Sequence, residues 1–239
     1  MDILQSITEK TQILADAEFE YAKTSDFSYL QSLNLDCTGI VMEATVIYFE
    51  IKNIDFMLKT GKRLAARVYK IYYHALQEVC KATGGHLNCY SPKAFLLIYP
   101  KDQFDETFVV DTAIKTANLF NITLRETIEK LVHVNFGIGV DHGNILGSKT
   151  TDESSYEHIA WFGKTIDKAI VISQLSQRPF FVGVSRSVHH QLDDSLKTTT
   201  KHILGIKKEV DLWTRMSYQF ENVKKHLYQT NALRSFNDK

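Results

Sequence analysis

Two charged residues next to predicted buried strands are the first candidates for a functional site in this sequence. Glu50 directly follows residues 45–49, a β-branched and aromatic run that is typical of a buried strand. Lys93 lies in a turn, immediately before the almost wholly apolar run 94–99. Because α/β folds place ligand-binding groups where strands end, these two side chains indicate a candidate site. The simpler interpretation of Glu50, a charged side chain that emerges into solvent, stays open.

The stretch 84–100, read GGHLNCYSPKAFLLIYP, predicts the elements that position Lys93. Gly84 and Gly85 supply the positive φ that a helix C-terminus often needs, so they end the preceding helix. Pro92 fixes its own φ and suits the second position of a tight turn. We therefore expect a helix, a glycine stop and a β-hairpin whose second strand lies in the core.

Hydrophobic periodicity predicts the remaining elements. Helical patterns, the last of them capped by Ser185, cover residues 3–23, 58–82, 163–173 and 185–192. A further helical region, 105–130, is expected to break near Asn121 and to restart with Thr123 as its cap. Strands are expected at 41–51, 131–141, 145–149, 156–162, 180–184 and 210–214. A hairpin turn at Gly143 and Asn144 would join two of them.

This order of elements predicts an α+β fold, in which helices pack mainly on one side of a mixed sheet. No repeat, low-complexity stretch or Pro/Gly linker divides the chain, which favours one domain with additions at both ends. We expect an N-terminal helical extension over residues 1–40, a core domain over 41–215 and a C-terminal tail over 216–239. From residue 217 on, the tail reads as amphipathic or partly frayed.

Composition excludes several classes of protein. The 28 Lys and Arg residues balance 28 Asp and Glu residues, which disfavours nucleic acids and membrane surfaces as partners. The basic cluster 197–208 is interrupted by apolar residues and reads as a solvated face. Three widely spaced cysteines argue against a disulfide framework and against a zinc site. The chain opens without an apolar signal core and holds no run of membrane-spanning length, so we expect a cytoplasmic protein.

Five blocks between about residues 46 and 214 resemble, in order, segments of the class III nucleotide cyclase catalytic domain, the adenylate and guanylate cyclase family. They read VIYFEIKNIDF, GGHLNCYSPKAFLLIY, FGIGVDHGNILGS, FGKTIDKAIVIS and GIKKEVDLW. The resemblance implies the ferredoxin-like or palm fold of that family, so that residues 41–215 would form a cyclase-homology domain. It also implies active sites at a head-to-tail dimer interface.

The resemblance places the family's functional positions on residues of other types. The two metal-binding aspartates fall on Glu50 and Lys93, and a lysine cannot ligate magnesium. The base-reading lysine falls on Cys89, the transition-state asparagine and arginine on Asp167 and Val171, and the closing lysine on Lys207 or Lys208. The scaffold is kept while residues for two-metal catalysis are missing. We therefore expect no catalytic residue and no metal or other cofactor.

Two functions follow from the resemblance. The first is a catalytically degenerate cyclase-like domain, a pseudoenzyme that acts as a regulatory or binding module in cyclic nucleotide signalling. It would form a homodimer, or a heterodimer with an active cyclase, and could bind a nucleotide. The alternative is a divergent, active nucleotide cyclase (a phosphorus–oxygen lyase), in which Glu50, Asp55 or Asp167 rebuilds a site for magnesium or manganese. For the first function we predict that the Lys93 ammonium replaces the metal and pairs with Glu50 or Asp55.

Overall fold

Strands and helices alternate along the computed structural model, which describes residues 3–29, 33, 37–53, 58–59, 61–91, 93–101, 105–128, 133–149, 159–177, 181–203 and 206–231. Its helices are α1 (Ile3–Asp16), α4 (Lys62–Thr83), α5 (Glu106–Thr123), the π-helical turn η2 (Leu124–Ile128), α6 (Lys164–Leu175), α7 (Arg186–Gln191) and α8 (Asp194–Lys197). Its strands are β1 (Glu20–Lys23), β2 (Thr38–Ile51), β3 (His86–Ser91), β4 (Ala94–Pro100), β5 (Phe136–Lys149), β6 (Ile159–Phe162), β7 (Val182–Ser185), β8 (Thr198–Ile203), β9 (Ile206–Asp211), β10 (Thr214–Phe220) and β11 (Val223–Thr230).

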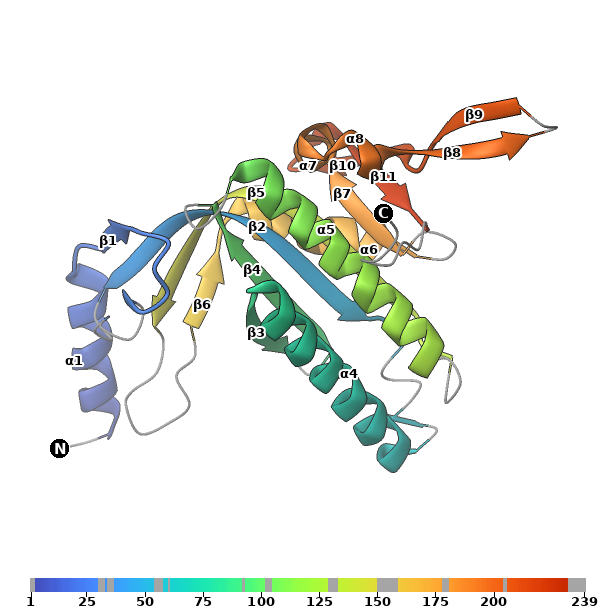
Figure 1. Cartoon of the computed structure of the whole chain (residues 1–239). Helices are drawn as coiled ribbons and strands as arrows, with labels where there is room; N and C mark the ends of the chain where they lie inside the picture. The colour runs from blue at the N-terminus through green and yellow to red at the C-terminus, as the bar shows by residue number, and fades with distance from the viewer. Residues whose placement is uncertain are drawn as a thin grey trace.

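A mixed β-sheet runs through the molecule (Figure 1). Within the described ranges it has nine strands, seven of them in the order β10-β11-β7-β5-β2-β4-β3. β1 adds to β2 and β6 adds to β5, while β8 and β9 form a separate two-stranded sheet. The β1–β2 and β5–β7 pairs are parallel, and the other pairs are antiparallel.

The central strand β2 is buried on both faces of the sheet. On one face Phe49 packs edge-to-face against Tyr72 of α4 and Phe120 of α5, at ring-centroid distances of 4.6 and 4.4 Å. On the opposite face Val46 belongs to a hydrophobic cluster that includes Ile166 of α6. The predicted fold, a mixed sheet with helices mainly on one side, is therefore confirmed, and α6 is the helix that covers the other face (Figure 1).

The hairpin and the helix before it follow the prediction closely. α4 ends at Gly84, whose φ of 73° is the left-handed C-cap expected of a glycine. β3 and β4 then pair antiparallel, and β4 is buried along its whole length. Ser185 caps α7 as predicted, with its hydroxyl accepting a hydrogen bond from the N–H of Val188. Local capping chemistry thus defines these segments well, while the predicted turn residue Pro92 lies outside the described residues.

The hairpin turn predicted at Gly143 and Asn144 is wrong. β5 begins at Phe136 and runs unbroken through this position, pairing with β2 along its length. Gly143 has a φ of 154°, and a Cβ there would meet the side-chain oxygen of Thr165 at the start of α6. The glycine therefore allows a close approach of α6 to the sheet instead of a change of chain direction.

The predicted C-terminal tail is also wrong over its described part. Residues 214–230 form β10 and β11, joined by Glu221 and Asn222, which have φ values of 48° and 62°. β11 pairs with β7 and so extends the main sheet. Burial of Leu227 and Gln229 in this strand favours the sheet over a free amphipathic segment. The strand expected at 210–214 is divided between the end of β9 and the start of β10.

Two helical predictions need correction as well. The helix expected over residues 3–23 ends at Asp16, because residues 20–23 form a strand that pairs in parallel with the start of β2. α5 does not break at Asn121 but continues into η2. The Thr123 hydroxyl donates back to the Leu119 carbonyl at 2.9 Å and does not cap a new helix. None of the helices in the described ranges combines the length and apolarity needed to cross a membrane.

Candidate functional site

Glu50 and Lys93 lie together where β2 ends and β4 begins. The pairing of these strands places Glu50 opposite Ala94, and the Ile51 N–H donates to the Lys93 carbonyl at 2.8 Å. This register brings Lys93 Nζ to 3.2 Å from Glu50 Oε1. The Glu50 side chain is 13% exposed and the Lys93 side chain 51%. The predicted ion pair is confirmed, while the other predicted partner, Asp55, lies outside the described residues.

A second ammonium acts on the same carboxylate. Lys52 directs its Nζ to the C-terminal end of α6, where it donates to the carbonyls of Gln174 at 2.8 Å and Ser176 at 2.7 Å. Burial lowers the pKa of Lys52, and the negative charge of Glu50 opposes that shift. The charge of Glu50 is thus offset by two lysines of its own chain, which disfavours the further approach of a divalent cation.

Hydrogen bonds fix residues 52 and 53, directly after β2, against the chain before β5. The Lys52 N–H donates to the Asn135 carbonyl at 2.7 Å, and the Asn135 N–H donates to Asn53 Oδ1 at 2.8 Å. The Asn53 side-chain amide donates to the His133 carbonyl at 2.9 Å. His133 lies just before β5 and contributes through its backbone carbonyl. Lys52 and Asn53, directly after β2, are therefore held by protein contacts.

α6 carries the two positions that the resemblance assigns to transition-state residues. Asp167 is exposed and Val171 is partly buried. The helix lies close on the sheet because Gly139 of β5 has no side chain, and a Cβ there would collide with the Ala169 carbonyl. Within the described part of this single chain, no hydrogen bond or ion pair joins Asp167 to the Glu50–Lys93 pair.

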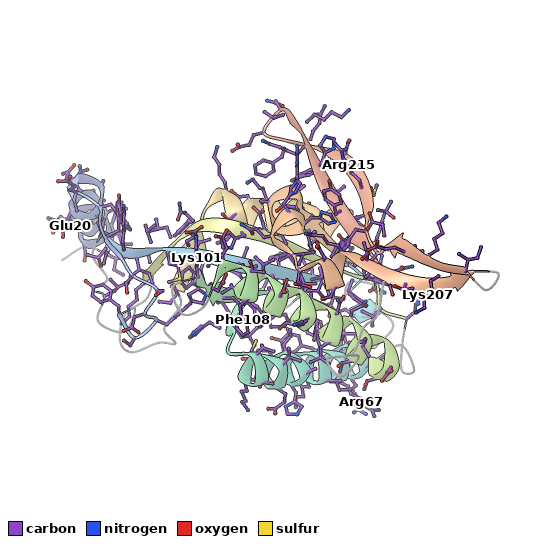
Figure 2. The ribbon with its side chains drawn as sticks, turned by 45° about the horizontal axis from the view of Figure 1, so that its top comes forward. Glu20, Arg67, Lys101, Phe108, Lys207 and Arg215 are labelled. Carbon is purple, nitrogen blue, oxygen red and sulfur yellow. The ribbon has the colours of Figure 1, made fainter. Side chains whose placement is uncertain are left out.

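The remaining sequence-predicted positions do not gather at this site. Cys89 lies on β3 with its backbone opposite Phe95, and its side chain lies outside the described part of the structure. Lys207 and Lys208 are exposed on β9, in the two-stranded ribbon that projects from the main sheet (Figures 1 and 2). The main sheet is completed by β10 and β11, so the block GIKKEVDLW falls outside it.

A polar cluster near the start of α5 was missed by sequence reasoning. Lys101, labelled in Figure 2, places Nζ 2.9 Å from Glu43 Oε2 and 3.1 Å from Glu106 Oε2. His142 is almost fully buried, with Nε2 3.1 Å from Glu43 Oε1 and Nδ1 2.8 Å from Thr45 Oγ1. The ligand-type atoms of Glu43, Glu106 and His142 lie within 4.8 Å of one another, as in a metal site. The Lys101 ammonium between the two carboxylates offsets one of their two negative charges.

Comparison with known proteins finds matches through the structure of this chain. No protein-family model and no curated protein matches the sequence. The crystal structure of the guanylyl cyclase Cya2 is similar with a TM-score of 0.66 at 12% identity, over 84% of this chain and 97% of that one. A bacterial light-regulated adenylyl cyclase has a TM-score of 0.65 at 15% identity, over 99% of this chain and 65% of that one. A class III adenylyl cyclase-like ATP-binding protein from Pseudomonas aeruginosa has a TM-score of 0.66 at 17% identity, over 80% of this chain and 43% of that one.

These similarities define the architecture. The chain has the fold of class III adenylyl and guanylyl cyclase domains, as the five sequence blocks indicated. It spans nearly the whole length of Cya2 but only 65% and 43% of the other two proteins. Structural similarity at 12–17% identity shows the fold, whereas function must be inferred from the residues at the site.

Proposed function

We propose that this protein is a catalytically degenerate cyclase-like domain, a pseudoenzyme that acts as a regulatory or binding module in cyclic nucleotide signalling. The observation that carries the proposal is the Lys93 ammonium, 3.2 Å from the Glu50 carboxylate. In two-metal phosphoryl chemistry, divalent ions held by carboxylates stabilise both the attacking and the leaving oxygens. Lys93 contributes a fixed positive charge that stabilises Glu50, but it cannot ligate an ion and so does not supply that chemistry.

The residues on α6 support the same proposal. The resemblance places the transition-state arginine at Val171, whose side chain has no charge. It places the transition-state asparagine at Asp167, whose negative charge would repel a phosphate. Loss of one electrostatic transition-state contact typically costs about 10²–10³ in rate. Together with Lys93, these substitutions remove contacts from both halves of the site that the family assembles in its dimer.

The binding partner that we propose is a second copy of the chain or an active cyclase, in the cytoplasm. A nucleotide is the small-molecule ligand that we propose first. One of the similar structures is named a class III adenylyl cyclase-like ATP-binding protein, which supports the choice of a nucleotide. Binding without turnover would let a module of this kind report nucleotide levels or hold a partner in one conformation.

The alternative function, a divergent active cyclase, is favoured by two observations. Glu50 keeps a carboxylate at the end of β2, and two of the similar structures are named as cyclases. Asp167, exposed on α6, could meet Glu50 of a second copy and supply another carboxylate. This alternative requires the Lys93 ammonium to move away when nucleotide and metal bind.

Calorimetric titration of ATP and GTP, with and without manganese, tests the proposal. We expect that manganese will not strengthen nucleotide binding to the wild type. Lys93→Asp places a second carboxylate beside Glu50 and should introduce manganese-dependent binding. Lys81→Asp, in an exposed pair on α4, is the matched control for the change of charge. Manganese-dependent binding by the wild type, equal to that of Lys93→Asp, would contradict the proposal.

A further inference from the structure

A basic pocket lies at the edge of the sheet opposite the hairpin that carries Lys93. β10 and β11 stand at one end of the strand order and β3 at the other. The pocket has a volume of ≈ 350 Å³ and is bounded by α6, the β7–α7 junction and the β10–β11 hairpin. This volume lies within the range of small-molecule sites, about 300–1,000 Å³. The pocket is therefore separate from the Glu50–Lys93 pair.

Positive charge is concentrated around this pocket. Four cationic side chains line it: Lys168, Arg186, Lys224 and Lys225. Lys224 and Lys225 form no ion pair with any carboxylate in the described ranges. Arg215, labelled in Figure 2, lies on the same β10–β11 hairpin. Cations that converge on a concave surface without matching carboxylates attract an anion.

One carboxylate, that of Asp141 on β5, lies behind the pocket wall. Its side chain is fully buried, with Oδ2 3.5 Å from Lys168 Nζ, and it accepts a hydrogen bond from Ser187 Oγ at 3.4 Å. Burial raises the pKa of Asp141, whereas a hydrogen bond from Ser185 and the charge of Lys168 lower it. Asp141 therefore positions Lys168 and Ser187 in the wall and balances at most one of the four cations.

Three neutral hydroxyl groups complete the pocket, those of Ser185, Ser187 and Tyr218. The two serine hydroxyls donate to Asp141, which leaves the Tyr218 phenol as the neutral donor for a ligand. Burial, with a smaller effect of Asp141, raises the pKa of Tyr218 to about 12, so its phenol stays protonated and can donate. Burial and the neighbouring cations lower the pKa of His226, the remaining lining residue, which favours its neutral form. Ammonium, guanidinium and hydroxyl donors around one cavity match the acceptor oxygens of a phosphate.

We propose that this pocket binds a small molecule that carries a phosphate or diphosphate group. Lys168, Lys224 and Lys225 would hold the phosphoryl oxygens together with the Tyr218 hydroxyl. A small ligand fits better than a nucleic-acid backbone, because the pocket is bounded by three parts of the fold and the chain has no net charge. The proposal goes beyond the function proposed above, since it places a ligand at a second site that does not involve Lys93.

Calorimetric titration of the full chain with inorganic pyrophosphate, at constant ionic strength, tests this site. We expect saturable binding that Lys224→Ala/Lys225→Ala weakens about tenfold or more. Lys207→Ala/Lys208→Ala removes two charges from exposed positions on β9 and should leave the affinity unchanged. Titration with ADP in parallel distinguishes a nucleotide from a free diphosphate as the preferred form of the ligand.

Asp141→Asn adds a test whose expected result differs from that of a purely structural role of Asp141. The isosteric amide removes the one negative charge behind the wall and frees Lys168, so the affinity should rise several-fold. Lys93→Ala should have no effect on pyrophosphate binding, which separates this site from the Glu50–Lys93 pair. Absence of saturable binding by the wild type, equal losses in the two double variants, or weaker binding by Asp141→Asn would each overturn the proposal.

Discussion

At the scale of single residues, the Glu50–Lys93 pair determines what the end of β2 can do. The carboxylate is mostly withdrawn from water, whereas about half of the lysine side chain is exposed. An ammonium partner therefore stabilises a group that would otherwise be a partly desolvated anion. The pair could be predicted from the sequence because both residues lie at the ends of strongly patterned strands that a hairpin brings together.

Lys93→Ala should lower the free energy of unfolding by roughly 1–2 kcal/mol, between the values for surface and buried pairs. The reason is that Glu50 would then have only the charge of Lys52 nearby. Urea unfolding measures the change. Lys81→Ala, which breaks the exposed Glu78–Lys81 pair, should cost much less, and magnesium should not raise the melting temperature of the wild type. Equal losses in the two variants would show that Lys93 is an ordinary surface lysine.

Glu43 should make stability depend on acid pH. A hydrogen bond from Lys101 lowers the pKa of Glu43 below its usual 4.5, against the smaller effect of burial. The stabilisation is therefore present above the unfolded pKa and is lost as the pH falls through the lower, folded pKa. Glu43→Gln should be less stable than the wild type at pH 7, and the difference should shrink below about pH 4.5. Unfolding curves measured between pH 7 and pH 3 check this, and a constant difference would contradict it.

This second cluster could not have been predicted residue by residue. Its contacts join Glu43 to Lys101, 58 positions apart, and to His142, 99 positions apart. Each residue alone reads as an ordinary charged or strand residue. Only the pairing of β2 with both β4 and β5 brings them together.

At the scale of elements, close contact between α6 and β5 sets the position of Asp167 and Val171. The strand passes beneath the helix at Gly139, where any side chain would collide with the Ala169 carbonyl. β5 could not be read correctly from the sequence, because Gly143 and Asn144 match a hairpin signal. The glycines of β5 mark the path of the helix over the sheet, which local propensity does not reveal.

Gly139→Ala should destabilise the protein by about 1–3 kcal/mol or more, because the helix must shift to admit the methyl group. Gly61→Ala is the matched control, since nothing lies within 4 Å of a Cβ at Gly61 and its φ of 172° is open to any residue. Urea unfolding of both variants measures the difference. Equal stability of the two variants would contradict the close contact between Gly139 of β5 and Ala169 of α6.

β10 and β11 show the other limit of sequence reasoning. Their residues are mostly polar and exposed, with Leu227 and Phe220 as isolated buried apolar positions, so the segment lacks the apolar alternation of a strong strand. Pairing with β7 supplies the stabilisation that the local sequence does not. By contrast, β2 and β4 were predictable because both of their faces are apolar.

At the scale of the whole molecule, the hairpin strand β4 offers no apolar surface to the predicted dimer. Its side chains Phe95, Leu97 and Tyr99 are all buried in the core of a single chain. Exposed apolar side chains lie instead on α1 and at the two ends of α6, where Phe162 and Leu175 are 52% and 41% exposed. The dimer is still a prediction, and we place its contact surface at the ends of α6.

Light scattering at tens of micromolar should therefore give about twice the chain mass of 27.4 kDa. Leu175→Glu should shift the protein toward the monomer, because it introduces a charge into the proposed apolar contact. Phe108→Glu is the matched control, since Phe108 is 53% exposed on α5, which covers the other face of the sheet (Figure 2). A monomeric mass for the wild type, or equal dissociation in both variants, would contradict the prediction.

The most direct measurement for the proposed function is a product assay on the wild-type chain with ATP or GTP and manganese. If Lys93 occupies the place of the metal, no cyclic nucleotide should form, and Glu50→Ala should behave like the wild type. Formation of cyclic AMP or cyclic GMP that Glu50→Ala abolishes would show that Glu50 holds a catalytic ion. That result would contradict the assignment of a pseudoenzyme.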